Sequence, residues 1–180
     1  MTSLGGPMNS SNFSGYIEEY GKDVYSFCIY LTRNKDDADD LYQQTFLIAI
    51  EKDEINTNDN PKSYLIAIAA NTWKNRVRKT LWRKKKAEIV YLDDENNVTE
   101  AVDEHGSAED LAVKNAEISA LRKYVMKLPD KLRIVILMFY MEDLPIAVIA
   151  ETLEIPEGTV KSRLNKAKKK LKEWMADYEG

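Results

Sequence analysis

The sequence has few of the residues on which covalent cross-links and metal sites depend. Its 180 residues include one cysteine, Cys28, and one histidine, His105. A single cysteine excludes an internal disulfide and a cysteine metal cluster, and it is typical of a reducing compartment. A single histidine excludes histidine-based metal sites and disfavours a serine–histidine or cysteine–histidine nucleophile. We therefore expect neither a bound metal nor a cofactor.

Long apolar segments and helix-breaking residues are also scarce. The longest apolar run is Ile134 to Met141, far short of the roughly 20 residues that span a bilayer. No apolar stretch follows the start, so we expect neither a secretory signal nor a membrane-inserted segment. Only 7 glycines and 5 prolines occur, while 44% of the residues are hydrophobic. This composition predicts a helical protein with a packed core.

The net charge of −4 conceals a strong segregation of charges along the chain. Residues 71–86 carry 8 basic and no acidic side chains, and residues 158–172 carry 7 basic side chains without an acid. Residues 1–70 (5 basic against 11 acidic) and 87–127 (4 against 10) each have a net charge of −6. Two short basic segments on an acidic chain indicate two separate contacts with a polyanion. The alternative is that each is an ordinary solvated helix face.

Hydrophobic periodicity predicts an N-terminal module of three helices over residues 13–86. Intervals of three and four residues indicate the first helix, with the apolar stripe Tyr16, Tyr20, Val24, Phe27 and Leu31. Asn34 suits the N-cap of a second helix, whose early acidic residues favour the positive end of the helix dipole. Pro61 suits the first position of a third helix. The apolar stripe of that third helix is Ile66, Ala70, Trp73, Val77 and Leu81.

A second module is predicted after an acidic linker. Residues 87–109 lose periodicity and gain acids, and a capping-box pattern at Ser107–Asp110 restarts a helix that runs to about Leu128. The second module then covers residues 110–178. Residues 1–12 are small and polar, so we expect them to be disordered, and part of them could be an expression remnant. The expected fold class is all-α, with two small helical domains joined by an acidic linker.

The most specific local signal lies in residues 143–174. A short helix from Pro145, a tight turn at Glu154–Gly158 and a longer basic helix have the layout of a helix-turn-helix. The apolar stripe of the longer helix is Val160, Leu164, Ala167, Leu171 and Trp174. The alternative is an ordinary helical hairpin with a basic face.

If Val160 points into the core, a rotation of about 100° per residue predicts which side chains of this helix point away from it. The side chains that face outward or flank the outward face are Lys161, Ser162, Asn165, Lys166 and Lys169. Arg163 lies nearer the buried edge, where it could anchor a phosphate or a carboxylate. Asparagine can read adenine and lysine can read guanine. Lys169, far from the N-terminus of the helix, is expected to contact phosphate.

Three segments of the second module, Leu128–Arg133, Ile149–Leu153 and Gly158–Leu164, together resemble region 4 of bacterial sigma factors. The resemblance is closest to the extracytoplasmic-function (ECF) group of the sigma-70 family, whose region 4 binds the minus-thirty-five promoter element and the polymerase flap. It implies that the duplex is read by Lys161, Ser162, Asn165 and Lys166, with Thr159 near the phosphate backbone. Asn165 and Lys166 differ from the residues common at these positions.

The second helix, Asp36–Lys52, has a mixed surface opposite the inward-facing Ala38. That surface and its border carry Asp40, Gln43, Gln44 and Leu47. Acidic, amide and leucine side chains together suit a protein contact, although Leu47 and Ile50 could instead pack on a neighbouring helix.

The segment Asp37–Phe46 is similar to the region 2 motif with which sigma factors bind the clamp-helix coiled coil of RNA polymerase. The resemblance implies that core polymerase is contacted by Asp39, Asp40, Gln43, Gln44 and Leu47. Gln44 stands where an acid is usual in the family.

The segments Tyr64–Asn71 and Lys74–Arg78 resemble the promoter-melting part of region 2. In the family this face captures flipped bases of the minus-ten element on the non-template strand. The resemblance implies such a role for Asn71, Lys74, Asn75 and Arg78. Amides can bond an exposed base edge, and cations can hold the backbone of a single strand.

The aromatic residues of the third helix divide into two kinds. Trp73 lies on the apolar stripe and is expected in the core, as is Tyr64. Trp82 lies beyond the end of the stripe among basic residues, which makes it the candidate for an exposed aromatic near DNA.

The resemblance covers about residues 13–86 and 110–174 and implies a promoter-specificity subunit that is not itself an enzyme. Such a protein binds core RNA polymerase, places region 4 on duplex promoter DNA and traps single-stranded DNA with region 2. The acidic linker would thread toward the RNA exit path. The implied further partner is an anti-sigma factor. The implied location is the bacterial cytoplasm, or the membrane where an anti-sigma factor holds the protein there.

Two other classes of function remain as alternatives. A dimeric helix-turn-helix regulator that is not a polymerase subunit would bind a palindromic duplex tightly by itself, and residues 64–86 would then have no use. An enzyme would require paired carboxylates, a nucleophile with a base or a phosphate loop, and the sequence shows none of these patterns.

Overall fold

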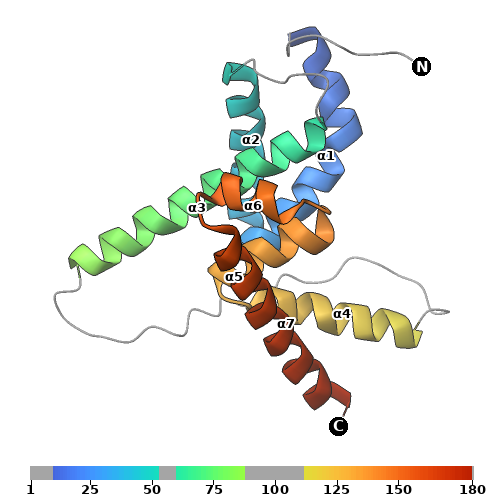
Figure 1. Ribbon diagram of the computed structural model, residues 1–180. Coiled ribbons are helices and arrows are strands. Elements are labelled where there is room, and N and C mark those ends of the chain that lie inside the picture. The colour runs from blue at the N-terminus through green and yellow to red at the C-terminus, as the bar shows by residue number, and fades with distance from the viewer. Residues whose placement is uncertain (1–9, 53–59, 88–111, 180) are drawn as a thin grey trace. The chain divides into compact units, whose positions relative to one another are not determined.

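The computed structural model describes residues 10–52, 60–87 and 112–179, and the regular structure within these ranges is helical (Figure 1). The chain divides into two compact units, residues 1–97 and 98–180. The expected fold class, two small helical domains, is therefore confirmed. Every helix within the described ranges is too short or too polar to span a bilayer. The predicted linker lies almost entirely outside these ranges.

Three helices form unit 1: α1 (Ser10–Thr32), α2 (Lys35–Lys52) and α3 (Pro61–Ala87). Helix α1 starts inside the stretch expected to be disordered. The large side chains that fill the core between the helices are Val24, Phe27, Leu31, Leu41, Phe46, Leu65 and Ile66. Four of the five residues in the stripe predicted for α1 are buried, and the fifth, Tyr20, is half-buried. The predicted stripe is therefore confirmed. Each fully buried side chain of this size contributes about 1.5–3 kcal/mol, which makes this core the main stabilising feature of the unit.

Asparagine side chains fix the starts of α2 and α3. Oδ1 of Asn34 accepts a hydrogen bond from the backbone N–H of Asp37 at 3.1 Å. Oδ1 of Asn60 accepts one from the backbone N–H of Lys62 at 3.1 Å. Each bond satisfies a donor that has no partner inside the first helical turn, and removing it costs about 1 kcal/mol. The predicted N-cap at Asn34 and the predicted start of α3 at Pro61 are both confirmed.

The C-terminal half of α3 leaves the core of unit 1, which differs from the predicted apolar stripe. Ala70 is buried and Val77 is half-buried, but Leu81 is 57% exposed. Helix α3 crosses α1 and α2 and then continues past them (Figure 1). The spacing of apolar residues indicates which face of a helix is apolar. It does not indicate how far the neighbouring helices extend along that face. The prediction that Leu81 is an inward residue was therefore wrong.

Unit 2 contains α4 (Ala112–Lys127), α5 (Asp130–Ile136), the π-helical turn η2 (Leu137–Met141), α6 (Ile146–Leu153) and α7 (Glu157–Glu179). Its core is filled by Leu132, Val135, Met138, Ile149, Leu153, Val160 and Leu164. Pro129 and Pro145 stand at the N-cap positions of α5 and α6. The predicted capping box at residues 107–110 lies outside the described residues.

A left-handed residue makes the turn between α6 and α7. Glu154 has φ 56° and ψ 45° and ends α6. The N–H of Ile155 donates to the carbonyl oxygen of Ala150 at 3.0 Å, which closes the helix end. Pro156 cannot continue α6 because it lacks an N–H, and α7 begins at Glu157. The predicted turn is thus present, but it is two residues shorter than expected because Glu157 and Gly158 belong to α7.

Cys28 lies in the core of unit 1 and is fully buried. Burial raises the pKa of its thiol to about 12, because a thiolate would lose its hydration there. The hydrogen bond to Asp39, followed by burial, raises the pKa of the Tyr25 hydroxyl. Burial also raises the pKa of Tyr42. The ionisation of all these groups is therefore linked to unfolding of unit 1.

We expect unit 1 to lose stability as the pH rises above about 9. The pKa of Cys28 is raised from 9.0 to about 12 in the folded protein. The neutral thiol therefore contributes fully to the free energy of unfolding below about pH 9, and this contribution is lost as the pH rises toward the folded pKa. Urea unfolding followed by circular dichroism from pH 7 to pH 11 measures this decline. The Cys28→Ala variant should show a shallower decline, and identical pH profiles for the two proteins would contradict the assignment.

Candidate nucleic-acid interface

Helix α7 separates a buried face from a basic face. Val160, Leu164, Ala167 and Leu171 are buried and Trp174 is half-buried, as their spacing predicted. The exposed side chains on the other face include Lys161, Ser162, Asn165, Lys166 and Lys169. The predicted orientation of the helix is therefore confirmed. Within unit 2 the basic face is open to an approaching polyanion.

Two further candidates, Thr159 and Arg163, are half-buried at the edge of that face. Thr159 lies in the first turn of α7, where the helix dipole favours an anionic group. Nζ of Lys169 lies 4.0 Å from a carboxylate oxygen of Glu173, and the two side chains are 80% and 60% exposed. An ion pair so exposed contributes little, so a phosphate could replace Glu173 as the partner of Lys169.

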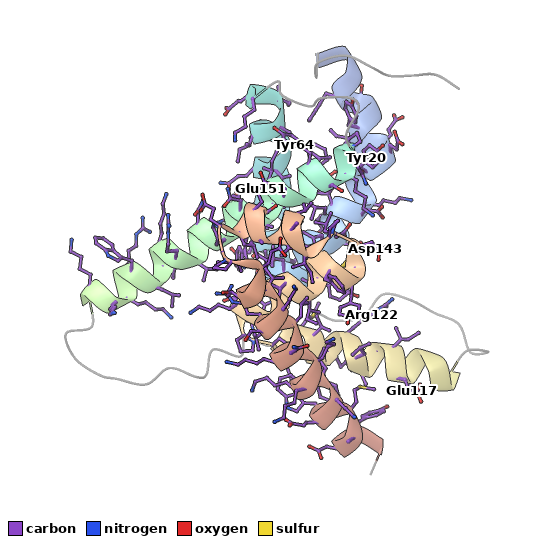
Figure 2. All side chains as sticks on the ribbon, in the orientation of Figure 1. Tyr20, Tyr64, Glu117, Arg122, Asp143 and Glu151 are labelled. Atoms are coloured by element: carbon purple, nitrogen blue, oxygen red, sulfur yellow. The ribbon has the colours of Figure 1, made fainter. Side chains whose placement is uncertain are left out.

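Helix α6 packs against α7 and completes the helix-turn-helix. Its inward side chains Ile149, Ala150 and Leu153 are buried, whereas Glu151 is exposed (Figure 2). A short supporting helix, a tight turn and a longer basic helix are the parts from which a major-groove reader is built. The predicted layout is confirmed.

The second basic surface is the projecting end of α3. All side chains from Arg78 to Lys86 are exposed. Side chains extend both above and below this end of α3 in Figure 2. Trp82 is 63% exposed, and Nζ of Lys86 lies 4.8 Å from the centroid of its ring system. An open groove of about 400 Å³ is lined by Arg78, Lys79, Trp82 and Arg83. An aromatic ring among cations suits the bases and phosphates of a single strand.

The amides predicted to bind bases are less accessible than expected. Asn71, Lys74 and Asn75 are all half-buried. Oδ1 of Asn71 is covered and has no hydrogen-bond partner in the described residues. Asn71 directly follows the buried Ala69 and Ala70 on α3, so it belongs to the part of this helix that is still packed in unit 1. In this conformation the Asn71 amide therefore does not present its oxygen to a ligand.

Helix α2 exposes the predicted contact face, here called the α2 face and defined by Asp40, Gln43, Gln44 and Leu47. Asp40 and Gln43 are exposed, Gln44 is half-buried, and Leu47 is 57% exposed. Ala38, on the opposite side, is fully buried. The described residues therefore do not cover Leu47, which removes the alternative that it packs on a neighbouring helix of unit 1. An exposed leucine among polar groups suits a protein partner.

Asp39 differs from the α2 face because it turns toward α1. Its Oδ1 accepts a hydrogen bond from the hydroxyl of Tyr25 at 2.7 Å. Its Oδ2 lies 3.8 Å from Nζ of Lys35. The structure thus gives Asp39 a part in joining α1 to α2, which the sequence motif did not indicate.

Sequence reasoning missed Arg76, which joins α2 to α3. Its Nη2 donates to Oδ2 of Asp40 at 2.6 Å and to Oε1 of Gln44 at 2.9 Å. Its Nη1 lies 3.7 Å from Oδ1 of Asp37, and its guanidinium carbon lies 5.8 Å from the ring centroid of Trp73. Arg76 is 36 residues from Asp40 along the chain, so no local pattern indicates this interaction.

Two family models match this chain: Sigma-70 region 2 over residues 16–83 and Sigma-70, region 4 over residues 118–171. The ECF RNA polymerase sigma factor SigW of Bacillus subtilis (strain 168) is 31% identical over 173 residues, which cover 92% of this chain and 89% of SigW. The ECF RNA polymerase sigma factor SigM of the same organism is 28% identical over 153 residues, with 85% and 88% covered.

Two solved structures share the fold. The sigma factor RpoE, crystallised with the anti-sigma factor NepR from Bartonella quintana, has a TM-score of 0.67 at 23% identity, with 92% of this chain and 98% of that chain covered. CnrH, in complex with the cytosolic domain of CnrY, has a TM-score of 0.59 at 17% identity, with 96% and 92% covered. The two region models and the similarity to SigW show the family as well as the fold. The chain belongs to the ECF group of the sigma-70 family of RNA polymerase sigma factors.

Proposed function

We propose that this sigma factor directs core RNA polymerase to specific promoters and promotes melting of the DNA there. The observation that carries the proposal is the presence of two different basic surfaces in one chain: the face of α7 and the projecting end of α3 with Trp82. A regulator that reads only duplex DNA needs the first surface. A protein that also holds an opened strand needs the second. The second basic surface therefore favours the sigma role over the dimeric regulator.

On duplex DNA, α7 occupies the major groove of the minus-thirty-five element. Residues near the N-terminus of such a helix contact base edges, and these are Lys161, Ser162, Asn165 and Lys166. Contacts with phosphates then come from Thr159, Arg163 and Lys169. The base contacts select the promoter, and the phosphate contacts fix the register of the helix.

On melted DNA, α3 holds the non-template strand of the minus-ten element. The exposed ring of Trp82 can stack on a base, while Lys74 and Arg78 hold the backbone. Asn75 and Asn71 bond base edges, the latter once its side chain turns outward. Binding unpaired bases favours the open duplex without any ATP hydrolysis.

The α2 face contacts the clamp-helix coiled coil of core polymerase. As a transcription initiation factor the chain is not a catalytic enzyme by itself, and it acts where the polymerase is, in the bacterial cytoplasm. RpoE and CnrH were solved in complexes, the first with the anti-sigma factor NepR and the second with the cytosolic domain of CnrY. We therefore also propose an anti-sigma partner for this chain.

The base-reading and phosphate-binding roles on α7 can be separated by substitution. Lys161→Ala or Asn165→Ala should change the preference at particular base pairs, by roughly 1–3 kcal/mol for each well-formed base-reading pair that is removed. Lys169→Ala should weaken binding to all sequences similarly and flatten the salt dependence. A promoter library probed with the reconstituted holoenzyme measures both effects. If the three variants behave alike across the library, the groove-facing assignment fails.

The α2 face can be tested with a matched pair of leucines. Leu47 and Leu81 are each 57% exposed in unit 1, so truncating either costs the free protein little. Leu47→Ala should weaken binding to purified core polymerase on the order of tenfold, because its side chain is buried in the complex. Leu81→Ala should bind like the wild type. Equal affinities for all three proteins, by fluorescence anisotropy without DNA, would remove the α2 face from the proposal.

The strand-trapping role rests on Trp82, and its neighbour Leu81 supplies the control. Trp82→Ala should reduce open-complex formation by about 1–3 kcal/mol, the contribution of one base–aromatic stack, and should spare the closed complex. Permanganate reactivity of unpaired thymines measures the opening. A promoter already melted by mismatches should recover part of the deficit, since base unpairing no longer opposes binding. An equal deficit for Leu81→Ala would indicate apolar packing of the helix end instead of base stacking.

A further inference from the structure

We propose that Arg76 is a positioning residue for polymerase binding, and that it acts by fixing the side chains of Asp40 and Gln44 on the α2 face. The inference rests on the proposed function, in which this face contacts core polymerase. Arg76 belongs to α3, the helix proposed to hold DNA, and its side chain is only 27% exposed. It therefore acts through its partners on α2.

The guanidinium of Arg76 is held on several sides. Nη2 donates to Asp40 at 2.6 Å and to Gln44 at 2.9 Å, and Nη1 lies 3.7 Å from Asp37. The ring of Trp73 lies beside the guanidinium carbon, which is 5.8 Å from the ring centroid. The donors of a guanidinium point in fixed directions. One planar group can thus order two side chains that would otherwise sample several rotamers.

These hydrogen bonds determine which atoms the α2 face presents to a partner. Oε1 of Gln44 accepts from Arg76, so the amide is oriented with its N–H donors directed elsewhere. Arg76 engages Oδ2 of Asp40, which leaves Oδ1 as an acceptor. The face then offers an ordered acceptor and an ordered donor one helical turn apart. Ordering them in the free protein avoids an entropic cost when polymerase binds.

A role confined to stability does not fit the exposure of the cluster. The side chain of Asp40 is 55% exposed and that of Asp37 is 50% exposed. Ion pairs this exposed are weakened by solvent and contribute little to folding. Removal of Arg76 should therefore leave unit 1 folded while disordering the polar part of the α2 face.

The experiment measures affinity for purified core polymerase without DNA, together with urea unfolding of each variant. Arg76→Gln should bind about tenfold more weakly, with an unfolding midpoint close to that of the wild type. Arg76→Lys should be intermediate, because an ammonium can pair with Asp40 but cannot hold both partners in the same geometry. Lys22→Gln, which removes the same charge from an exposed position of α1, should bind like the wild type.

A double-substitution background separates positioning from direct contact. In a protein that already carries Asp40→Ala and Gln44→Ala, the further change Arg76→Gln should have no effect on affinity. A tenfold weaker affinity in that background would mean that Arg76 touches the polymerase itself, which overturns the inference. Wild-type affinity of folded Arg76→Gln in the otherwise native chain would overturn it too. In either case weaker binding by Leu47→Ala would show that the α2 face still stands.

Discussion

Burial of one apolar stripe fixes the rotation of each functional helix, and that rotation decides which polar side chains remain for a partner. In α7 the stripe of Val160, Leu164 and Ala167 is buried, so the basic residues between them face outward. A slip of one residue would rotate the helix by about 100° and carry lysines into the core, where an unpaired charge is strongly unfavourable. The energy that folds unit 2 therefore also orients the surface proposed to read DNA.

In helix α3, burial of the apolar stripe fixes the rotation over only the first half of the helix. Its first half is held by Leu65, Ile66 and Ala70 in the core, and its second half extends past α1 and α2. The anchored half supplies a rigid base, while the projecting half exposes Trp82 and a series of cations. Arg76 lies at the transition between the halves and bonds α3 to α2. The proposed DNA surface and the proposed polymerase surface of unit 1 thus share one packed framework.

Much of the fold could be predicted from the sequence because the signals are local. The stripes of α1 and α7, the cap at Asn34 and the proline at the start of α3 all depend on neighbouring residues, and each was confirmed. The resemblance to regions 2 and 4 likewise rests on contiguous motifs. The features that escaped prediction depend on other helices. Leu81 is exposed because α3 continues past α1 and α2. The oxygen of Asn71 is covered by the packing of unit 1. Arg76 meets Asp40 across 36 residues, and only the fold brings them together.

The central claim is that this chain gives core RNA polymerase its promoter preference, and reconstituted run-off transcription tests it most directly. Purified core enzyme with the chain should produce transcripts from defined start sites, and footprinting should locate protection over both promoter elements. Core enzyme alone should produce no such transcripts. The promoter-directing role would be contradicted if the chain left the transcripts of core enzyme unchanged and, without polymerase, bound tightly to a palindromic duplex, as a dimeric regulator would.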